Sequence, residues 1–435
     1  MQGNTKQHWL ILSHCFNMDG RAASQTITDK LPYLAEAGIE PIILSGVSGE
    51  HDKKFMHFQF VPWGPAGLRF DMRHVIASHI GRGYLYKLLV GLLGLILSPF
   101  ILIERGLLGW QNQWSWSLPA TLRSLWLIHK YKPTILYTTG GAYSAHLAGY
   151  WIKRLTGIRW IVEVHDPMVK PGIAPATRDD RFNAYIESLI CRHADLAWWF
   201  TDGALNGARQ RYPELGNRGV VILPGVAKPS VTGHYCRGEK MIISHFGSLS
   251  DTRSLQPVVK AMHALLEQKP EIRPKIRVHV YGGSIDKQAK AEIARYGLDE
   301  VFVGFGRLER SAETGMSGRE QVLERMFQAD CLLLVHGTIS DCSEYIPSKL
   351  YEYLWTGRPV IAFTYQNPQL DQLVAERGGY VAHGDQVDDM VRGLAQAYAD
   401  WEADRLPMSK LPAIGVQQAV TKILDKVTTF KVEII

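Results

Sequence analysis

The feature that most constrains the fold of this chain is a rhythm of short apolar runs, each followed by a helix-length segment. In the first half of the sequence these runs are 8–12, 40–44, 134–138, 159–164, 194–200 and 220–223. Apolar runs of this length, bounded by turn residues and spaced by helical patterns, are typical of buried parallel strands joined by crossover helices. The first half therefore predicts a doubly wound α/β domain.

The same rhythm starts again after a polar stretch at residues 225–239. Its runs are 241–246, 277–281, 301–304, 331–335, 360–363 and 379–382. A length of 435 residues allows two large domains. We predict Rossmann-like doubly wound domains at 1–228 and 229–435, facing a central cleft, with the last helix a candidate to pack back on the first domain. Ligands of such sheets bind at the carboxyl ends of the strands.

Positive charge is confined to the first half. Residues 1–230 hold 24 Lys and Arg against 16 Asp and Glu, a net charge of +8, whereas the remainder holds 24 against 26, or −2. An excess of this kind favours an anionic partner for the first domain only. No helix-turn-helix, zinc-knuckle or RNP-like pattern accompanies it, so we expect a membrane surface and no nucleic acid.

An apolar run, Leu88 to Ile103, lies in the same basic half within an insert near 84–108. A straight helix of 16 residues reaches roughly 24 Å, short of the roughly 30 Å of bilayer hydrocarbon, and Ser98-Pro99 is expected to kink or break it. We interpret it as a segment that dips into one leaflet. A buried helical hairpin and a true span are the alternatives.

Several classes are disfavoured by missing patterns. The first strand is not followed by G-x-G-x-x-G, and no G-x-x-x-x-G-K-[ST] occurs, which argues against a dinucleotide dehydrogenase or P-loop ATPase. The apolar run at 9–12 is too short for a signal peptide. Five widely spaced cysteines without CxxC spacing indicate reduced thiols and no metal framework. We expect a cytoplasmic protein.

The segment 341–363, DCSEYIPSKLYEYLWTGRPVIAF, is the most informative for chemistry. Pro347 suits the first turn of a helix that Gly357 ends. Lys349 then lies in the first turn, where a cation is unfavourable unless an anion such as phosphate binds there. The alternative is a simple i,i+3 pair with Glu352. Glu344 and Glu352 are separated by seven residues, an E-x7-E arrangement, and could hold sugar hydroxyls.

These residues resemble the GT-B glycosyltransferases of glycosyltransferase family 4, whose bacterial members read P-S-K-L-x-E-Y at this place, and the resemblance covers nearly the whole chain. It implies that Glu344 contacts the donor sugar, that Glu352 accepts hydrogen bonds from the ribose, and that Ser348 and Lys349 bind the diphosphate.

Two further segments resemble donor-site elements of this family. HFGSLSDTR, 245–253, looks like the strand and glycine turn that open the donor domain, which implies diphosphate contacts from Gly247, Ser248 and Arg253. A cap at 250–252 would place Arg253 in the first turn of the next helix; the family more often has arginine where Ser248 stands, and a solvated arginine is the alternative. VFVGFGRL, 301–308, resembles the loop that binds the nucleobase and implies contacts from Gly304, Phe305, Gly306 and Arg307, with Phe305 otherwise a core aromatic.

Three loops of the first domain match the family's acceptor side. His165 and Asp166, after the strand 159–164, are the candidates to approach the transferred sugar or the acceptor hydroxyl, although a histidine there is often purely structural. Asp19, Gly20 and Arg21 match its glycine loop. Gly140 and Gly141 follow another strand, where a plain tight turn would look the same.

The resemblance implies a retaining transfer from a UDP- or GDP-sugar to a lipid-linked or envelope saccharide acceptor, as in lipopolysaccharide or other surface polysaccharide synthesis, at the cytoplasmic face of a bacterial inner membrane. No D-x-D triplet is present in the sequence, so we expect no metal or other cofactor. The rival interpretations are a non-hydrolysing nucleotide-sugar 2-epimerase, which would not need the apolar insert, and a catalytically inactive sugar-nucleotide-binding scaffold.

Overall fold

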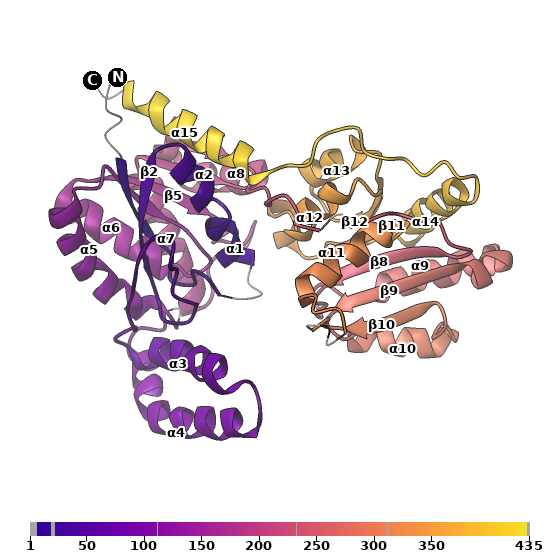
Figure 1. Cartoon of the computed structure of the whole chain (residues 1–435), viewed down its shortest axis with the longest axis horizontal. Helices are drawn as coiled ribbons and strands as arrows, with labels where there is room; N and C mark the ends of the chain where they lie inside the picture. Colours follow the sequence, from indigo (N-terminus) through magenta and orange to yellow (C-terminus); the bar gives the residue numbers. More distant parts are fainter. Residues whose placement is uncertain are drawn as a thin grey trace. The chain divides into compact units, whose positions relative to one another are not determined.

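The computed structural model describes residues 7–18, 22–110, 112–231, 233–309, 311 and 313–432. The chain forms two compact units. Unit 1 comprises Met1–Gly225 and Val416–Ile435, and unit 2 comprises Val226–Gly415. Each unit is a parallel sheet covered by helices (Figure 1). The predicted pair of doubly wound Rossmann-like α/β domains is confirmed.

The sheet of unit 1 has seven parallel strands in the order β3-β2-β1-β4-β5-β6-β7. They are β1 (Gln7–Leu12), β2 (Ile39–Ser45), β3 (Met56–Gln59), β4 (Ile135–Thr138), β5 (Arg159–Val164), β6 (Leu196–Trp199) and β7 (Gly219–Val221). All six predicted strands are present. The sequence analysis missed β3, a short edge strand whose MHFQ sequence has no apolar run.

Helices cover both faces of this sheet, because alternate residues of each strand point to opposite sides. One core contains Leu10 and Leu12 of β1 with α5 (Ser117–Tyr131), α6 (Ser144–Thr156), α7 (Arg178–His193) and α8 (Asp202–Arg211). The other contains Trp9 and Ile11 with α1 (Ala22–Thr28), α2 (Leu31–Glu36) and the C-terminal helix α15 (Val416–Val432). Unit 1 is thus closed by the last helix of the chain.

A helical hairpin, α3 (Pro65–Ile80) and α4 (Tyr84–Leu107), projects from unit 1 (Figure 1). Of the kink or break predicted at Ser98-Pro99, the break is wrong: α4 continues through Pro99 and is 24 residues long, roughly 36 Å. Pro99 removes one backbone donor, and the Ser98 hydroxyl donates to the Gly94 carbonyl in the same turn. By length and composition α4 could cross a membrane.

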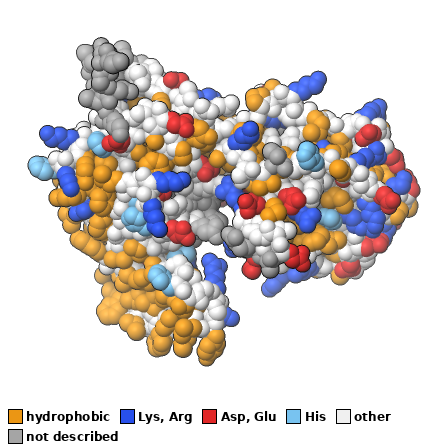
Figure 2. All heavy atoms as spheres, viewed as in Figure 1, with side chains coloured by type: hydrophobic (Ala, Val, Ile, Leu, Met, Phe, Trp, Pro, Cys, Tyr) orange, Lys and Arg blue, Asp and Glu red, His pale blue; other side chains and the backbone are white. Residues whose placement is uncertain are grey.

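The outer side of α4 is not buried, so the buried-hairpin alternative is also wrong. Its most apolar 18-residue window is only 11% buried, and hydrophobic side chains gather over the hairpin in Figure 2. From the middle of α4 to its C-terminal end, six large hydrophobic residues expose more than half of their surface. They are Leu95, Ile96, Phe100, Leu102, Ile103 and Leu107.

Unit 2 has six parallel strands in the order β10-β9-β8-β11-β12-β13. They are β8 (Met241–Gly247), β9 (Ile276–Gly282), β10 (Phe302–Gly306), β11 (Cys331–Val335), β12 (Val360–Thr364) and β13 (Tyr380–His383), all of them predicted. One face packs on α9 (Gln256–Gln268), α10 (Lys287–Tyr296) and α14 (Val387–Glu402). The other packs on α11 (Gly318–Gln328), α12 (Lys349–Thr356) and α13 (Pro368–Ala375).

The strand order reverses at one point in each sheet, between β1 and β4 in unit 1 and between β8 and β11 in unit 2. At such a point, the loops that leave two neighbouring strands turn to opposite faces of the sheet. The gap between these two loops is where α/β sheets bind ligands. The loops after β1, β4, β8 and β11 are therefore the places to examine for a site.

Candidate active site

In unit 1, a buried carboxylate organises the loops after β4 and β5. Glu163, fully buried on β5, accepts hydrogen bonds from Lys30 Nζ at 2.5 Å, Tyr137 OH at 2.5 Å and Thr139 Oγ1 at 2.6 Å. Lys30 is also fully buried, between α1 and α2. Burial alone would raise the pKa of Glu163, but the Lys30 charge and the nearby His165 outweigh it and hold that pKa well below its usual range. Glu163 is therefore an ionised, fixed acceptor.

This carboxylate orients His165. The Thr139 hydroxyl donates to Glu163, so its oxygen is left to accept from His165 Nε2 at 2.9 Å. His165 is thereby assigned as the Nε2–H tautomer, and its ring lies against Phe200 at 5.1 Å. In the neutral imidazole, the remaining nitrogen, Nδ1, carries the lone pair. Asp166, the next residue, is exposed and is not held in this network.

The glycine loop after β4 lies beside the loop after β1. Gly140 has φ +112°, which favours glycine, and a Cβ there would lie 3.1 Å from Ser13 Oγ. Gly141 follows directly. Asp19, Gly20 and Arg21, the other predicted acceptor residues, lie outside the described residues.

In unit 2, the loop after β8 carries Gly247, Ser248 and Arg253. Gly247 has φ +146°. The prediction that Arg253 lies in the first turn of a helix is wrong: residues 250–253 form a tight turn, closed by hydrogen bonds between the Ser250 and Arg253 backbones, and α9 begins at Gln256. Pro257, which favours a first turn, sets that start.

The Arg253 side chain points toward the ends of β8 and β11. Its Nε is buried and has no hydrogen-bond partner in the described part of the chain, and its charge reaches His245 and His336. Gly337 makes room for this loop, since a Cβ there would lie 2.5 Å from the Thr252 carbonyl oxygen. A guanidinium group with an unused donor at a strand end is suited to an anion.

Two neutral imidazoles accompany Arg253, and the sequence analysis assigned neither of them a role. Burial lowers the pKa of His245 to about 4, against the hydrogen bond to the Leu333 carbonyl and with help from the Arg253 charge. Burial likewise lowers the pKa of His336 to about 4. The sequence signal for both residues is their position. Each histidine lies near the end of a buried strand at the switch point or directly after it.

The short helix α12 presents the predicted donor residues. Lys349 lies in its first turn and Gly357 ends it with φ +67°, as predicted. Lys349 Nζ contacts both Glu352 carboxylate oxygens, at 3.0 and 2.8 Å, which is the i,i+3 pair of the alternative interpretation. Ser348 precedes the helix, and Glu344, 7% exposed, ends a 3-10 turn at Ser340–Glu344.

The loop at the end of β10 carries the predicted nucleobase residues. Phe305 is 47% exposed, so it is not a core aromatic. It stacks on Tyr281 at 4.7 Å, and Tyr281 stacks on Phe246 at 4.9 Å. This row of rings ends in an exposed aromatic face next to Gly306, which has φ +66°, and Arg307.

The described residues contain no group of three or more His, Cys, Asp or Glu side chains that could hold a metal ion. A cavity of about 130 Å³ opens beside Thr252 and Thr338 at the ends of β11 and β12, and none of the predicted site residues lines it. The two units thus carry separate groups of candidates: an oriented histidine in unit 1, and a set of cations and carboxylates in unit 2. The second set suits a sugar attached to a nucleoside diphosphate.

Two parallel doubly wound units with candidate groups at their switch points define the class, the GT-B fold of glycosyltransferases. No family model matches the chain, and no curated protein matches it in sequence. The family 4 assignment therefore stays a prediction.

Solved structures are similar over nearly the whole chain. Sucrose-phosphate synthase from Thermosynechococcus elongatus superposes with a TM-score of 0.66 at 13% identity, over 98% of this chain and 100% of that one. The E. coli trehalose-6-phosphate structure with bound UDP-2-fluoro glucose gives 0.60 at 12%, over 97% and 96%. WaaG, a glycosyltransferase involved in lipopolysaccharide biosynthesis, gives 0.53 at 11%, over 96% and 95%. A Listeria monocytogenes chain assigned as a UDP-N-acetylglucosamine 2-epimerase is less similar, at 0.51 and 11%, over 98% and 97%.

Proposed function

We propose that this protein is a retaining glycosyltransferase that moves a sugar from a nucleoside-diphosphate sugar to a lipid-linked or envelope saccharide acceptor. Unit 2 binds the donor and unit 1 presents the acceptor. The single observation that carries the donor assignment is Arg253, whose buried Nε donor lies unused beside two neutral histidines at the switch point of unit 2. A diphosphate supplies the missing acceptor oxygens.

We propose the following chemistry. The bond between the sugar C1 and the phosphate oxygen breaks, and the nucleoside diphosphate leaves with the electron pair. The acceptor oxygen forms its bond to C1 on the same face, and its proton passes to the departing phosphate. Arg253 and Lys349 stabilise the charge that develops on that phosphate; Lys349 must leave Glu352 to do so, which frees the Glu352 carboxylate for the ribose hydroxyls. Retention follows from the resemblance to glycosyltransferase family 4.

Protein side chains supply these charges without a metal, so we propose no metal or other cofactor. The donor is a UDP- or GDP-sugar. His165, held as the Nε2–H tautomer, offers Nδ1 as an acceptor to a sugar or acceptor hydroxyl, and Asp166 is an exposed carboxylate beside it.

We further propose that the protein associates peripherally with the cytoplasmic face of a bacterial inner membrane through α4. The exposed apolar side of α4 is flanked by the exposed cations Arg82, Lys87 and Arg105, an arrangement that suits anionic headgroups. Helix α3, packed along α4, carries Arg69 and Arg73. Pulling those charges through hydrocarbon is costly, so α4 lies in the plane of one leaflet.

The enzyme assay uses the purified full chain with a panel of UDP- and GDP-sugars, with and without a bacterial membrane lipid extract, and measures nucleotide release and labelled lipid product. Nucleotide release that requires the extract supports the proposal. An epimerised donor without extract would identify a 2-epimerase, the function of the less similar structural neighbour. Binding of donors without turnover would identify a scaffold.

The membrane assay is flotation with vesicles of phosphatidylethanolamine and phosphatidylglycerol. Changing Leu92, Leu95 and Ile96 together to Ser should release the protein, since each apolar side chain contributes about 1.5–3 kcal/mol when buried. Leu155→Ser, at a leucine 66% exposed on α6, is the matched control and should still float. Full flotation of the triple variant would refute docking through α4.

A further inference from the structure

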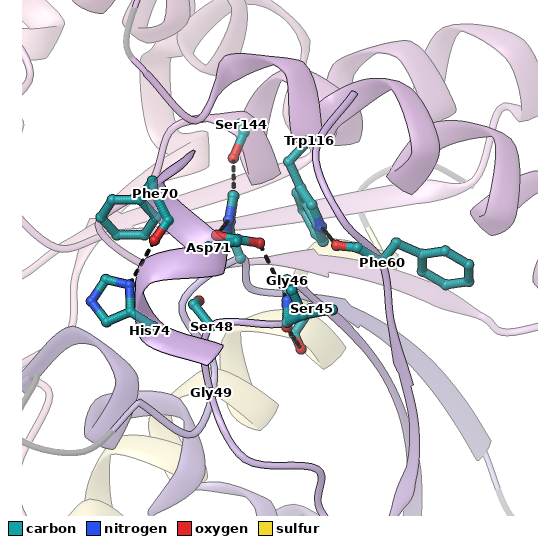
Figure 3. Close-up of polar contacts among 12 residues, drawn as sticks. Ser45, Gly46, Ser48, Gly49, Phe60, Phe70, Asp71, His74, Trp116 and Ser144 are labelled. Atoms are coloured by element: carbon teal, nitrogen blue, oxygen red, sulfur yellow. Dashed lines mark hydrogen bonds and ion pairs between the residues drawn. The ribbon is translucent and has the colours of Figure 1, made fainter. Parts of the chain in front are cut away.

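The inner helix of the hairpin buries a carboxylate against the loop that follows β1. Asp71 of α3 accepts a hydrogen bond from His14 Nε2 at 2.9 Å, and its second oxygen accepts from the Val47 backbone N–H at 3.3 Å. The other nitrogen of His14, Nδ1, lies 3.2 Å from Ser144 Oγ, at the start of α6. Figure 3 shows the contacts of Asp71 and Ser144. All three side chains are 0–1% exposed.

An Asp-His-Ser series is also the arrangement of a nucleophilic triad. Here complete burial leaves no route for a substrate to the Ser144 hydroxyl. We therefore infer that these three side chains have a structural role: they hold their segments in place. Their hydrogen bonds join three segments that are far apart in sequence: the hairpin of α3 and α4, the loop after β1, and helix α6, which follows Gly140 and Gly141.

The surroundings of this pair are apolar. Cys15, Met18 and Ala142 pack with Phe70 of α3 in one small cluster. Apolar contacts of this kind are non-directional and would let α3 shift along the loop, whereas a buried polar pair is satisfied in one geometry only. The fit is close: a Cβ on Gly46 would lie 2.6 Å from the His14 ring and 2.8 Å from Asp71 Oδ2.

We propose that Asp71 and His14 form a clasp that sets the register of the hairpin on the acceptor-side loops, so that fixing α4 on a membrane also fixes residues 13–18 and 139–147. His14 and Asp71 are positioning residues: neither touches the reacting atoms. The link to an acceptor rests on the proposed function. So does the response of these loops to a membrane, since membrane docking through α4 is part of that function; the buried contact between His14 and Asp71 does not.

The test is hydrogen exchange on the full chain, with and without vesicles of phosphatidylethanolamine and phosphatidylglycerol in a 3:1 ratio. In the wild type, vesicles should slow exchange at 84–107 and also at 13–18 and 139–147, the latter two by at least about threefold. Slowing at 84–107 with unchanged loops would overturn the clasp while leaving membrane docking intact. No slowing anywhere would overturn both docking and clasp, and donor turnover in the enzyme assay would still stand separately.

Variants separate the clasp from the membrane contact. In Asp71→Ala, vesicles should still protect 84–107, because the exposed face of α4 is unchanged, but 13–18 and 139–147 should no longer respond. Asp71→Asn keeps an acceptor for His14 and should restore part of the response. Ser78→Ala, an exposed change on the same helix, should behave as the wild type. A full loop response in Asp71→Ala would overturn the proposal, and the wild-type measurement decides it if that variant does not fold.

Discussion

The buried pair of Lys30 and Glu163 gives the sharpest stability prediction. Both side chains are at most 1% exposed and their charged atoms are 2.5 Å apart. Glu163→Gln leaves the Lys30 ammonium buried with the Thr26 carbonyl as a neutral hydrogen-bond acceptor, and breaking a buried pair from one side costs about 3–5 kcal/mol. Against a typical total of about 5–15 kcal/mol, unit 1 should be close to its stability threshold.

Removing both charges should cost much less. In a Lys30→Met, Glu163→Gln double variant, the Gln amide oxygen still accepts from Tyr137 or Thr139 and the methionine fills the lysine volume, so we expect a loss of no more than about 2 kcal/mol. Ten of the twelve tryptophans lie in unit 1, so urea unfolding followed by tryptophan fluorescence reports mainly on this unit.

The control is a pair that is not fully buried. Lys153 and Asp195 are 2.7 Å apart with side chains 23% and 21% exposed, and Lys153→Met should cost about 1 kcal/mol or less. If Glu163→Gln costs no more than this control, or if the double variant is as unstable as the single ones, the reasoning fails. Because the pKa of Glu163 is lowered, its contribution is present above the unfolded value of about 4.3 and lost as the pH falls below it.

Two further predictions concern the switch point of unit 2, and a third concerns the packing of α6 in unit 1. Arg253→Ala should weaken UDP binding by roughly 10- to 100-fold, the value of a charge-assisted hydrogen bond, and Arg253→Lys should restore little of it; unchanged titration calorimetry would exclude Arg253 from the site. The pKa values of His245 and His336 in the folded chain, about 4, lie below the unfolded value of about 6.5. Their contribution to the free energy of unfolding should therefore be complete above pH 6.5 and fall as the pH drops toward 4, by about 1 kcal/mol per histidine at pH 5.5. A free energy of unfolding that does not change between pH 7.5 and 5.5 would contradict this. Gly149→Ala should lower the free energy of unfolding by about 1–3 kcal/mol, since the added Cβ would lie 2.6 Å from Trp160 Nε1. An unchanged unfolding midpoint would contradict this prediction and show that the surrounding side chains relax.

The sequence determined the fold because each central strand is a largely apolar run. Strands such as Cys331–Val335 are buried on both faces of a parallel sheet, so they stand out as runs without alternation. The edge strand β3 lacks such a run and was missed. Helix starts were less certain: Pro257 decided the start of α9 against three polar candidates for a cap.

The sequence also determined which loops carry the candidates. All strands of a parallel sheet end at one edge, so residues that follow neighbouring strands of one sheet, such as Gly140 and His165, lie at the same edge whatever the helices do. It further determined the apolar character of 88–103. It did not determine that this segment is part of one continuous helix through Pro99, because proline more often kinks or ends a helix.

Only the tertiary structure decided which residues pair. His14 meets Asp71 across 57 positions, and Lys30 meets Glu163 across 133. No local pattern marks either contact, because each depends on how α1, α2 and α3 are placed on the sheet. Periodicity is a local property that can be identified directly in the sequence, whereas a buried polar pair forms only when the chain folds and brings its two residues together.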